Sequence, residues 1–134
     1  MDKILITGGS GYFGSLLRDR LEVSRLIDLW SCLGLPLQLM VTVPSGQNAL
    51  PAPKGRPLPI ADAFPGGWSP ENQAAWIKHY FPLFFAKPAV HGVFWNQLRD
   101  DETCEFPYAG LVDTSGAIKT AFTALSGLRR KYLD

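Results

Sequence analysis

Three glycines near the N-terminus are the first residues whose spacing could do chemistry. Gly8, Gly11 and Gly14 recur every three residues, between an apolar β-branched run at 3–7 and an amphipathic stretch that begins at Ser10. Glycine tolerates positive φ angles and lets a pyrophosphate approach the backbone. The N-terminus of a helix supplies free N–H groups and a positive dipole end. The spacing therefore predicts either a dinucleotide phosphate site or a tight strand-to-helix turn.

The cysteines and histidines indicate neither a metal site nor a nucleophile. Cys32 and Cys104 are too few for a disulfide framework, and their spacing matches no metal site. Neither has a basic neighbour in sequence that would mark a reactive thiol. We expect Cys32 to be buried between a helix and the sheet, and Cys104 to lie in a loop. His79 on a helix and His91 within a strand are expected to be ordinary core or surface residues.

The apolar pattern predicts the elements that position these residues. Short apolar runs alternate with stretches of helical period, which gives the order β-α-β-α-β-α. Strand–helix–strand units make neighbouring strands parallel. The expected fold class is therefore α/β with parallel strands, as a partial (β/α) barrel or a small open parallel sheet whose two faces both need covering. The expected strands are 3–7, 37–43 and 89–95, and the expected helices are 10–33, 69–87 and 117–132.

The segment 44–68 breaks this pattern. It holds six of the eleven prolines and four glycines, and it has no visible period. A stretch of this length without secondary structure is a functional loop or a linker in most domains. We interpret it as a long loop between a strand and a helix.

Composition excludes several classes of protein. The chain has 134 residues, which predicts about one domain, and a formal net charge of +1. A binder of nucleic acid or of an anionic membrane would carry a basic surplus. No apolar run approaches the ~20 residues that span a bilayer. We expect a cytoplasmic protein that binds neither nucleic acid nor membrane.

The glycine segment resembles the N-terminus of the extended short-chain dehydrogenases, which include nucleotide-sugar epimerases. The resemblance covers residues 1–21 and rests on Thr7-Gly8-Gly9-Ser10-Gly11-Tyr12-Phe13-Gly14. It implies that Gly8, Gly11 and Gly14 line the diphosphate of NAD(P), with Tyr12 and Phe13 where the helix begins. The family's Tyr-x-x-x-Lys pair is absent, as is a charged residue after the second strand. No cofactor is therefore required, and an NAD(P)-binding fragment stays an alternative.

Residues 22–134 resemble a different family, the (β/α)8 glycoside hydrolases of the family-ten xylanase type. The resemblance implies the end of such a barrel, from the helix before the seventh strand onward. The stretches that carry it are 25–30 with 33–39, Ser69-Pro70-Glu71-Asn72-Gln73-Ala74-Ala75-Trp76, Val90-His91-Gly92-Val93-Phe94-Trp95, and 109–113 with 116–125.

The carboxylates that such hydrolases use are missing. Members hydrolyse a β-glycosidic bond with an acid/base and a nucleophile. The strand that carries the acid/base is not in this chain, and the stretch 40–44, which matches the end of the seventh strand, has no carboxylate. The run Asp100, Asp101 and Glu102 is expected to be a solvated loop, because a catalytic pair needs two different environments. We therefore predict no catalytic residue.

Sugar binding makes smaller demands, namely flat aromatic faces and a few hydrogen-bonding groups. The resemblance implies a site at the carboxyl end of the third strand, where barrel active sites gather. Trp95 is either this sugar platform or part of the sheet core. The candidate sugar-binding residues are Trp95, Asn96, Gln97, Arg99, Asp100, Trp68 and Tyr108.

The two resemblances meet inside one expected helix, near Arg20–Glu22. The sequence thus predicts a dehydrogenase-like start at 1–21 joined to a partial hydrolase at 22–134. Three strands cannot close an eight-stranded barrel, so exposed sheet edges would favour self-association. A carbohydrate-binding fragment, an NAD(P)-binding fragment and a product with neither function all stay open.

Overall fold

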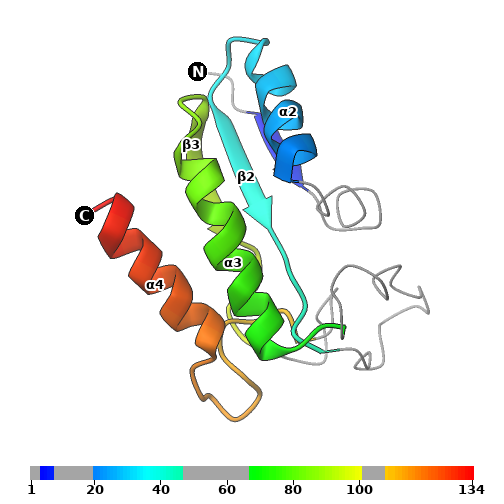
Figure 1. Ribbon diagram of the computed structural model, residues 1–134. Coiled ribbons are helices and arrows are strands. Elements are labelled where there is room, and N and C mark those ends of the chain that lie inside the picture. The colour runs from blue at the N-terminus through cyan, green and yellow to red at the C-terminus, as the bar shows by residue number, and fades with distance from the viewer. Residues whose placement is uncertain (1–3, 8–19, 47–66, 101–107) are drawn as a thin grey trace, which may run out of the picture.

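Among the described residues, three strands and three helices alternate, as the apolar pattern predicts. The computed structural model describes residues 4–7, 20–46, 67–100 and 108–134. In chain order the elements are β1 (Ile4–Thr7), α2 (Arg20–Ser31), β2 (Leu37–Val41), α3 (Pro70–Phe85), β3 (Val90–Trp95) and α4 (Thr120–Tyr132) (Figure 1). Two predictions fall outside the described residues: the glycine motif with Gly8, Gly11, Tyr12, Phe13 and Gly14, and most of the loop 44–68.

The strands form one open, parallel sheet in the order β1-β2-β3. Thr7 pairs with Met40, and Val41 pairs with Trp95, so the carboxyl ends of the strands lie along one edge. The register of β2 and β3 shifts between Leu37 and Gln38. The prediction of an α/β fold with a small open parallel sheet is confirmed.

Helix α3 supplies more of the described core than any other element. Its start follows from sequence: the Ser69 hydroxyl accepts a hydrogen bond from the Asn72 N–H at 3.1 Å, and Pro70 occupies the first turn. The helix lies across the sheet and beside α4 (Figure 1). It buries a mostly aromatic face against Leu37, Leu39 and Val41 of β2. That face consists of Trp76, Ile77, Tyr80, Phe81 and Phe84.

The opposite face of the sheet is only partly covered by the described residues. Side chains alternate across a strand, so Met40 and its partner Phe94 point away from the face that carries Leu39. Phe94 is 49% exposed and packs over Gly92, where a Cβ would come within 2.9 Å of its ring. The expected covering of both sheet faces is thus not seen in the part of the chain that is described.

The prediction of a buried Cys32 is wrong. Helix α2 ends at Ser31, and the chain turns at Gly34, which adopts a φ of +68°. Cys32 therefore lies in the turn beyond the helix, exposed, with its thiol 3.4 Å from the Asp28 carbonyl oxygen. Gly34 ends the helix as its sequence position indicates.

Truncating Ile77 to alanine tests the importance of the α3 core. Ile77 is fully buried, so Ile77→Ala should lower the free energy of unfolding by about 2–5 kcal/mol. Its neighbour Lys78 is exposed, and Lys78→Ala should change it by less than about 0.5 kcal/mol. Urea unfolding followed by circular dichroism measures both, and equal effects would contradict this packing.

Candidate functional site

A buried ion pair lies beyond the carboxyl ends of β2 and β3. The Lys119 ammonium lies 2.5 Å from a carboxylate oxygen of Asp100, and the two side chains are 9% and 2% exposed. The ammonium also donates to the Ser45 hydroxyl at 3.0 Å and to the Tyr108 carbonyl oxygen at 2.9 Å. The pair therefore connects the segments after β2 and β3 to the start of α4.

Residues 108–110 are held on several sides. The Tyr108 carbonyl oxygen accepts hydrogen bonds from the Ser45 N–H and hydroxyl, at 3.2 and 2.7 Å. The Ala109 carbonyl oxygen accepts one from the Trp95 indole N–H at 2.9 Å. The Gly110 N–H donates to Asp100 at 2.8 Å. A backbone segment with this many partners has little freedom to move.

Gln73 joins this cluster from helix α3. Its side chain is fully buried, and its amide donates to the Val43 carbonyl oxygen at 2.7 Å and more weakly to the Ala109 carbonyl oxygen at 3.4 Å. Its Oε1 has no hydrogen-bond partner among the described residues. The polar cluster, as we call it, consists of Ser45, Gln73, Asp100, Lys119 and the backbone of 108–110.

Two glycines allow the close packing of these segments. A Cβ on Gly110 would lie 2.5 Å from the Asp100 nitrogen and 2.6 Å from the Arg99 carbonyl carbon. A Cβ on Gly46 would lie 2.5 Å from Cδ2 of the Tyr108 ring. Real Cβ atoms do not approach other atoms so closely, so both positions depend on the missing side chain.

Trp95 is a half-buried residue anchored by its indole nitrogen. Its ring packs 6.4 Å from that of Phe81, against the core cluster, and its N–H is occupied by Ala109. The structure therefore shows Trp95 packing partly into the core, and its role as a sugar platform stays a prediction.

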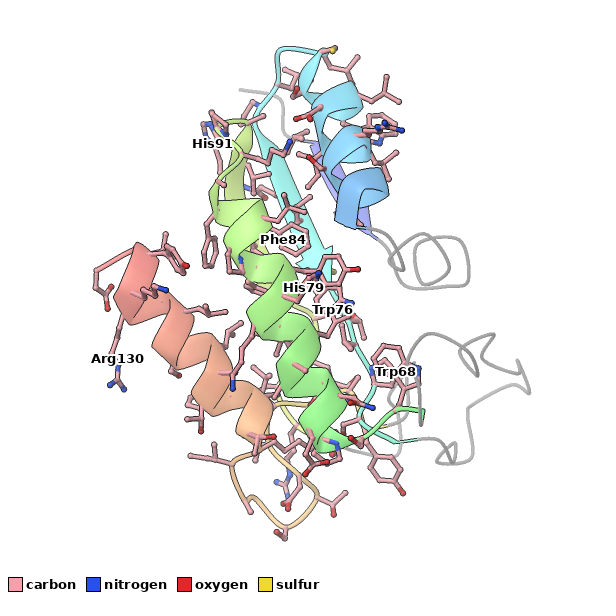
Figure 2. All side chains as sticks on the ribbon, in the orientation of Figure 1. Trp68, Trp76, His79, Phe84, His91 and Arg130 are labelled. Atoms are coloured by element: carbon pink, nitrogen blue, oxygen red, sulfur yellow. The ribbon has the colours of Figure 1, made fainter. Side chains whose placement is uncertain are left out.

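The other predicted sugar-binding residues divide into two groups. Tyr108 and Asp100 belong to the polar cluster, and Trp68 lies just before α3, half-buried, near the start of that helix (Figure 2). Asn96 is exposed just after β3, and Arg99 is exposed with its guanidinium donating to the Thr114 carbonyl oxygen at 2.7 Å. Gln97 donates to the Arg99 carbonyl oxygen at 3.1 Å.

The expectation that Asp100 belongs to a solvated loop is wrong. Asp100 is buried because Lys119 neutralises its charge and Gly110 supplies a backbone donor. Asp101 and Glu102 lie outside the described residues. Sequence reasoning did not identify Ser45, Gln73 or Lys119 as members of a site. A lysine directly before an amphipathic helix is the one local signal of such a pair.

Asp113 closes a separate turn before α4. One carboxylate oxygen accepts hydrogen bonds from the Ser115 hydroxyl at 2.6 Å, the Ala117 N–H at 2.8 Å and the Ser115 N–H at 2.8 Å. These donors favour the charged form, so the Ser115 hydroxyl first and then the backbone N–H groups hold the pKa of Asp113 below its ordinary value of 3.8.

The described residues contain neither a candidate metal site nor a helix that could span a membrane. Among residues 4–7, 20–46, 67–100 and 108–134, no cluster of three or more His, Cys, Asp or Glu side chains could hold a metal ion. None of the described helices has the length and apolar character needed to cross a bilayer.

Several solved glycosidase structures contain a part with a similar fold. The chain superimposes on the β-glucuronidase of Bifidobacterium dentium with a TM-score of 0.68 over 98% of its length, at 17% identity. The β-glucuronidase of Faecalibacterium prausnitzii gives 0.63 over 97% at 16% identity. A GH2 β-galacturonidase of Eisenbergiella tayi, bound to galacturonate, gives 0.62 over 96% at 18% identity. No protein-family model and no curated protein sequence matches the chain.

The likeness is one of fold. Our chain spans 20%, 21% and 23% of the lengths of these three structures. Nearly the whole chain therefore superimposes on about a fifth of the length of each structure. The division of the chain near residues 21 and 22, predicted from the two resemblances, stays a prediction.

Adding one methyl group at Gly110 tests the close packing at the site. Gly110→Ala should lower the free energy of unfolding by about 1–3 kcal/mol, because the new Cβ meets backbone atoms that cannot move aside. The matched control is Gly127 in α4, where a Cβ meets nothing within 4 Å. Gly127→Ala should stabilise the helix by about 0.5–1 kcal/mol. Urea midpoints that shift the same way would contradict the geometry.

The turn at Asp113 gives a prediction on pH. Ser115→Ala removes the largest cause of the lowered pKa, so the pKa of Asp113 should rise toward 3.8. A depressed carboxyl pKa stabilises the fold above the unfolded value, and this stabilisation is lost as the pH falls through the folded value. The variant should therefore lose less stability on acidification below about pH 4. An NMR titration of the Asp113 carboxyl measures the pKa directly, and Thr114→Ala, one residue away, is the control that should leave it unchanged.

Proposed function

We propose that this chain is part of a carbohydrate-active protein of the glycoside hydrolase kind, and that its sugar-binding surface is the carboxyl edge of β2 and β3. The observation that carries the proposal is the superposition over 98% of the chain on a β-glucuronidase. In parallel α/β folds ligands bind at the carboxyl ends of the strands. The polar cluster and Tyr108 lie at that edge.

The side chains at this edge suit a sugar. Sugar rings present apolar C–H faces that pack on flat aromatic rings, and Tyr108 and Trp68 are half-buried there, each with part of its surface accessible. Asn96, directly after β3, is exposed and offers an amide donor and acceptor. We expect these residues to contact the ligand, with the Trp95 indole N–H holding the Ala109 carbonyl oxygen next to Tyr108.

The described residues favour binding over hydrolysis. A retaining glycosidase places two carboxyl groups about 5 Å apart, one as acid and one as nucleophile. Asp100 is occupied by Lys119 and the Gly110 N–H, and Asp113 is occupied by its own turn. The proposed fragment is therefore catalytically incomplete within its described ranges.

Two sugar classes compete for this surface. The sequence resemblance predicts β-1,4-xylan chains, whereas the superimposed structures are named for glucuronides and galacturonides. The Arg99 side chain, just beyond β3, is exposed and donates to the Thr114 carbonyl oxygen, and the carboxylate of a uronic acid would suit its guanidinium as a further acceptor. The NAD(P) alternative rests on residues 8–14, outside the described ranges, and no described residue favours it.

Calorimetric titration tests the proposal. The whole chain is titrated with xylohexaose, glucuronic acid and galacturonic acid in separate experiments. Tyr108→Asn removes the ring but keeps a residue that tolerates positive φ, and it should weaken sugar binding about tenfold. Tyr132→Asn, at the far end of α4 (Figure 1), should leave the affinity unchanged. Absence of binding to all three sugars would refute the proposed function.

A further inference from the structure

Tyr108 adopts a backbone conformation that residues other than glycine rarely adopt. Its φ is +52°, in the left-handed region, and among the described residues it is the one non-glycine with positive φ. Bulky residues remain there only where the surroundings hold them, and such residues gather at functional sites. The direction of the Tyr108 side chain is therefore fixed by specific contacts.

The polar cluster provides those contacts. The Tyr108 carbonyl oxygen accepts three hydrogen bonds, two from Ser45 and one from the Lys119 ammonium. Asp100 holds the same ammonium and also receives the Gly110 N–H. The peptide groups on either side of Ala109 are thus both tied to the Lys119–Asp100 pair.

The ring itself rests on Gly46. The position of a Cβ on Gly46 would be 2.5 Å from ring atom Cδ2, 3.2 Å from Cε2 and 3.4 Å from Cγ of Tyr108. The Cδ2 edge of the ring therefore lies against the backbone of the segment that follows β2. Tyr108 as a whole remains partly exposed, so part of the ring stays accessible to a ligand.

We propose that Lys119 and Asp100 are positioning residues that, through Ser45 and Gly46, hold the Tyr108 ring ready to stack against a sugar ring. The inference rests on the proposed function and adds the residues that fix the platform in place. A platform that is rigid before binding loses little conformational entropy when the ligand arrives. Breaking the ion pair should therefore weaken sugar binding without removing any group that touches the sugar.

An NMR measurement reports the positioning without any ligand. A Gly46 Hα against the edge of an aromatic ring is shifted by the ring current, and the shift vanishes if the ring moves away. Lys119→Met keeps the length of the side chain and removes its charge, so the Gly46 signal should move toward its random-coil position. Lys119→Arg keeps the charge and should restore most of the ring-current shift. A merely structural role for Lys119 would leave this signal unchanged in the folded protein.

Sugar affinity supplies the second measurement. With whichever of xylohexaose, glucuronic acid or galacturonic acid the unmodified chain binds, Lys119→Met should weaken the affinity about tenfold and Lys119→Arg only slightly. If Lys119→Met does not fold, Gly46→Ala decides, because it displaces the ring by direct contact and leaves the ion pair intact. Gly46→Ala should weaken binding to a similar degree, whereas Gly127→Ala should have no effect.

The outcomes separate the two proposals. If the unmodified chain binds a sugar and the folded Lys119 and Gly46 variants bind it equally well, the positioning inference is overturned while the proposed function stands. If the unmodified chain binds none of the three sugars, the proposed function fails, and the platform role of Tyr108 fails with it. Weakened binding together with a lost Gly46 shift supports both.

Discussion

The positions of the segments around Ser45, Asp100 and Tyr108 depend on the ion pair between Lys119 and Asp100. Removing two charges from water is costly, and the mutual attraction compensates only when further hydrogen bonds satisfy both groups. Here Lys119 reaches Ser45 and the Tyr108 carbonyl oxygen, and Asp100 receives the Gly110 N–H. Three segments that carry no regular strand or helix are thereby held at fixed positions.

Helix α3 couples this polar region to the apolar core. Gln73 in its first turns bonds to the backbone of Val43 and Ala109, while Ile77, one turn later, is buried against the sheet. The same helix therefore packs on the sheet and holds the backbone of Val43 and Ala109 at the carboxyl edge of the sheet. A shift of α3 along its axis would disturb both the burial of Ile77 and the hydrogen bonds of Gln73.

The sequence predicts the fold more completely than it predicts the residues of the site. Apolar periodicity indicates each strand and helix because burial repeats every two or about 3.6 residues, and Gly34 and Ser69 mark boundaries through local backbone chemistry. The polar cluster has no such signature. Ser45 and Lys119 are far apart in sequence, and their contact depends on the packing of β2, α3 and α4. The acidic neighbours of Asp100 suggest solvent exposure, whereas its partner Lys119 lies directly before α4 and reaches it only in the folded chain.

Because the Tyr108 ring lies so close to Gly46, substitutions at these two positions should be linked in evolution. While the tyrosine ring occupies its place, any side chain at position 46 would overlap it. Replacing the glycine while the tyrosine is retained would force the ring to move, whereas no such overlap arises once a smaller residue has replaced the tyrosine. Homologous chains, where they are compared, should thus show the two sites changing in a set order, with glycine retained wherever the aromatic residue is retained.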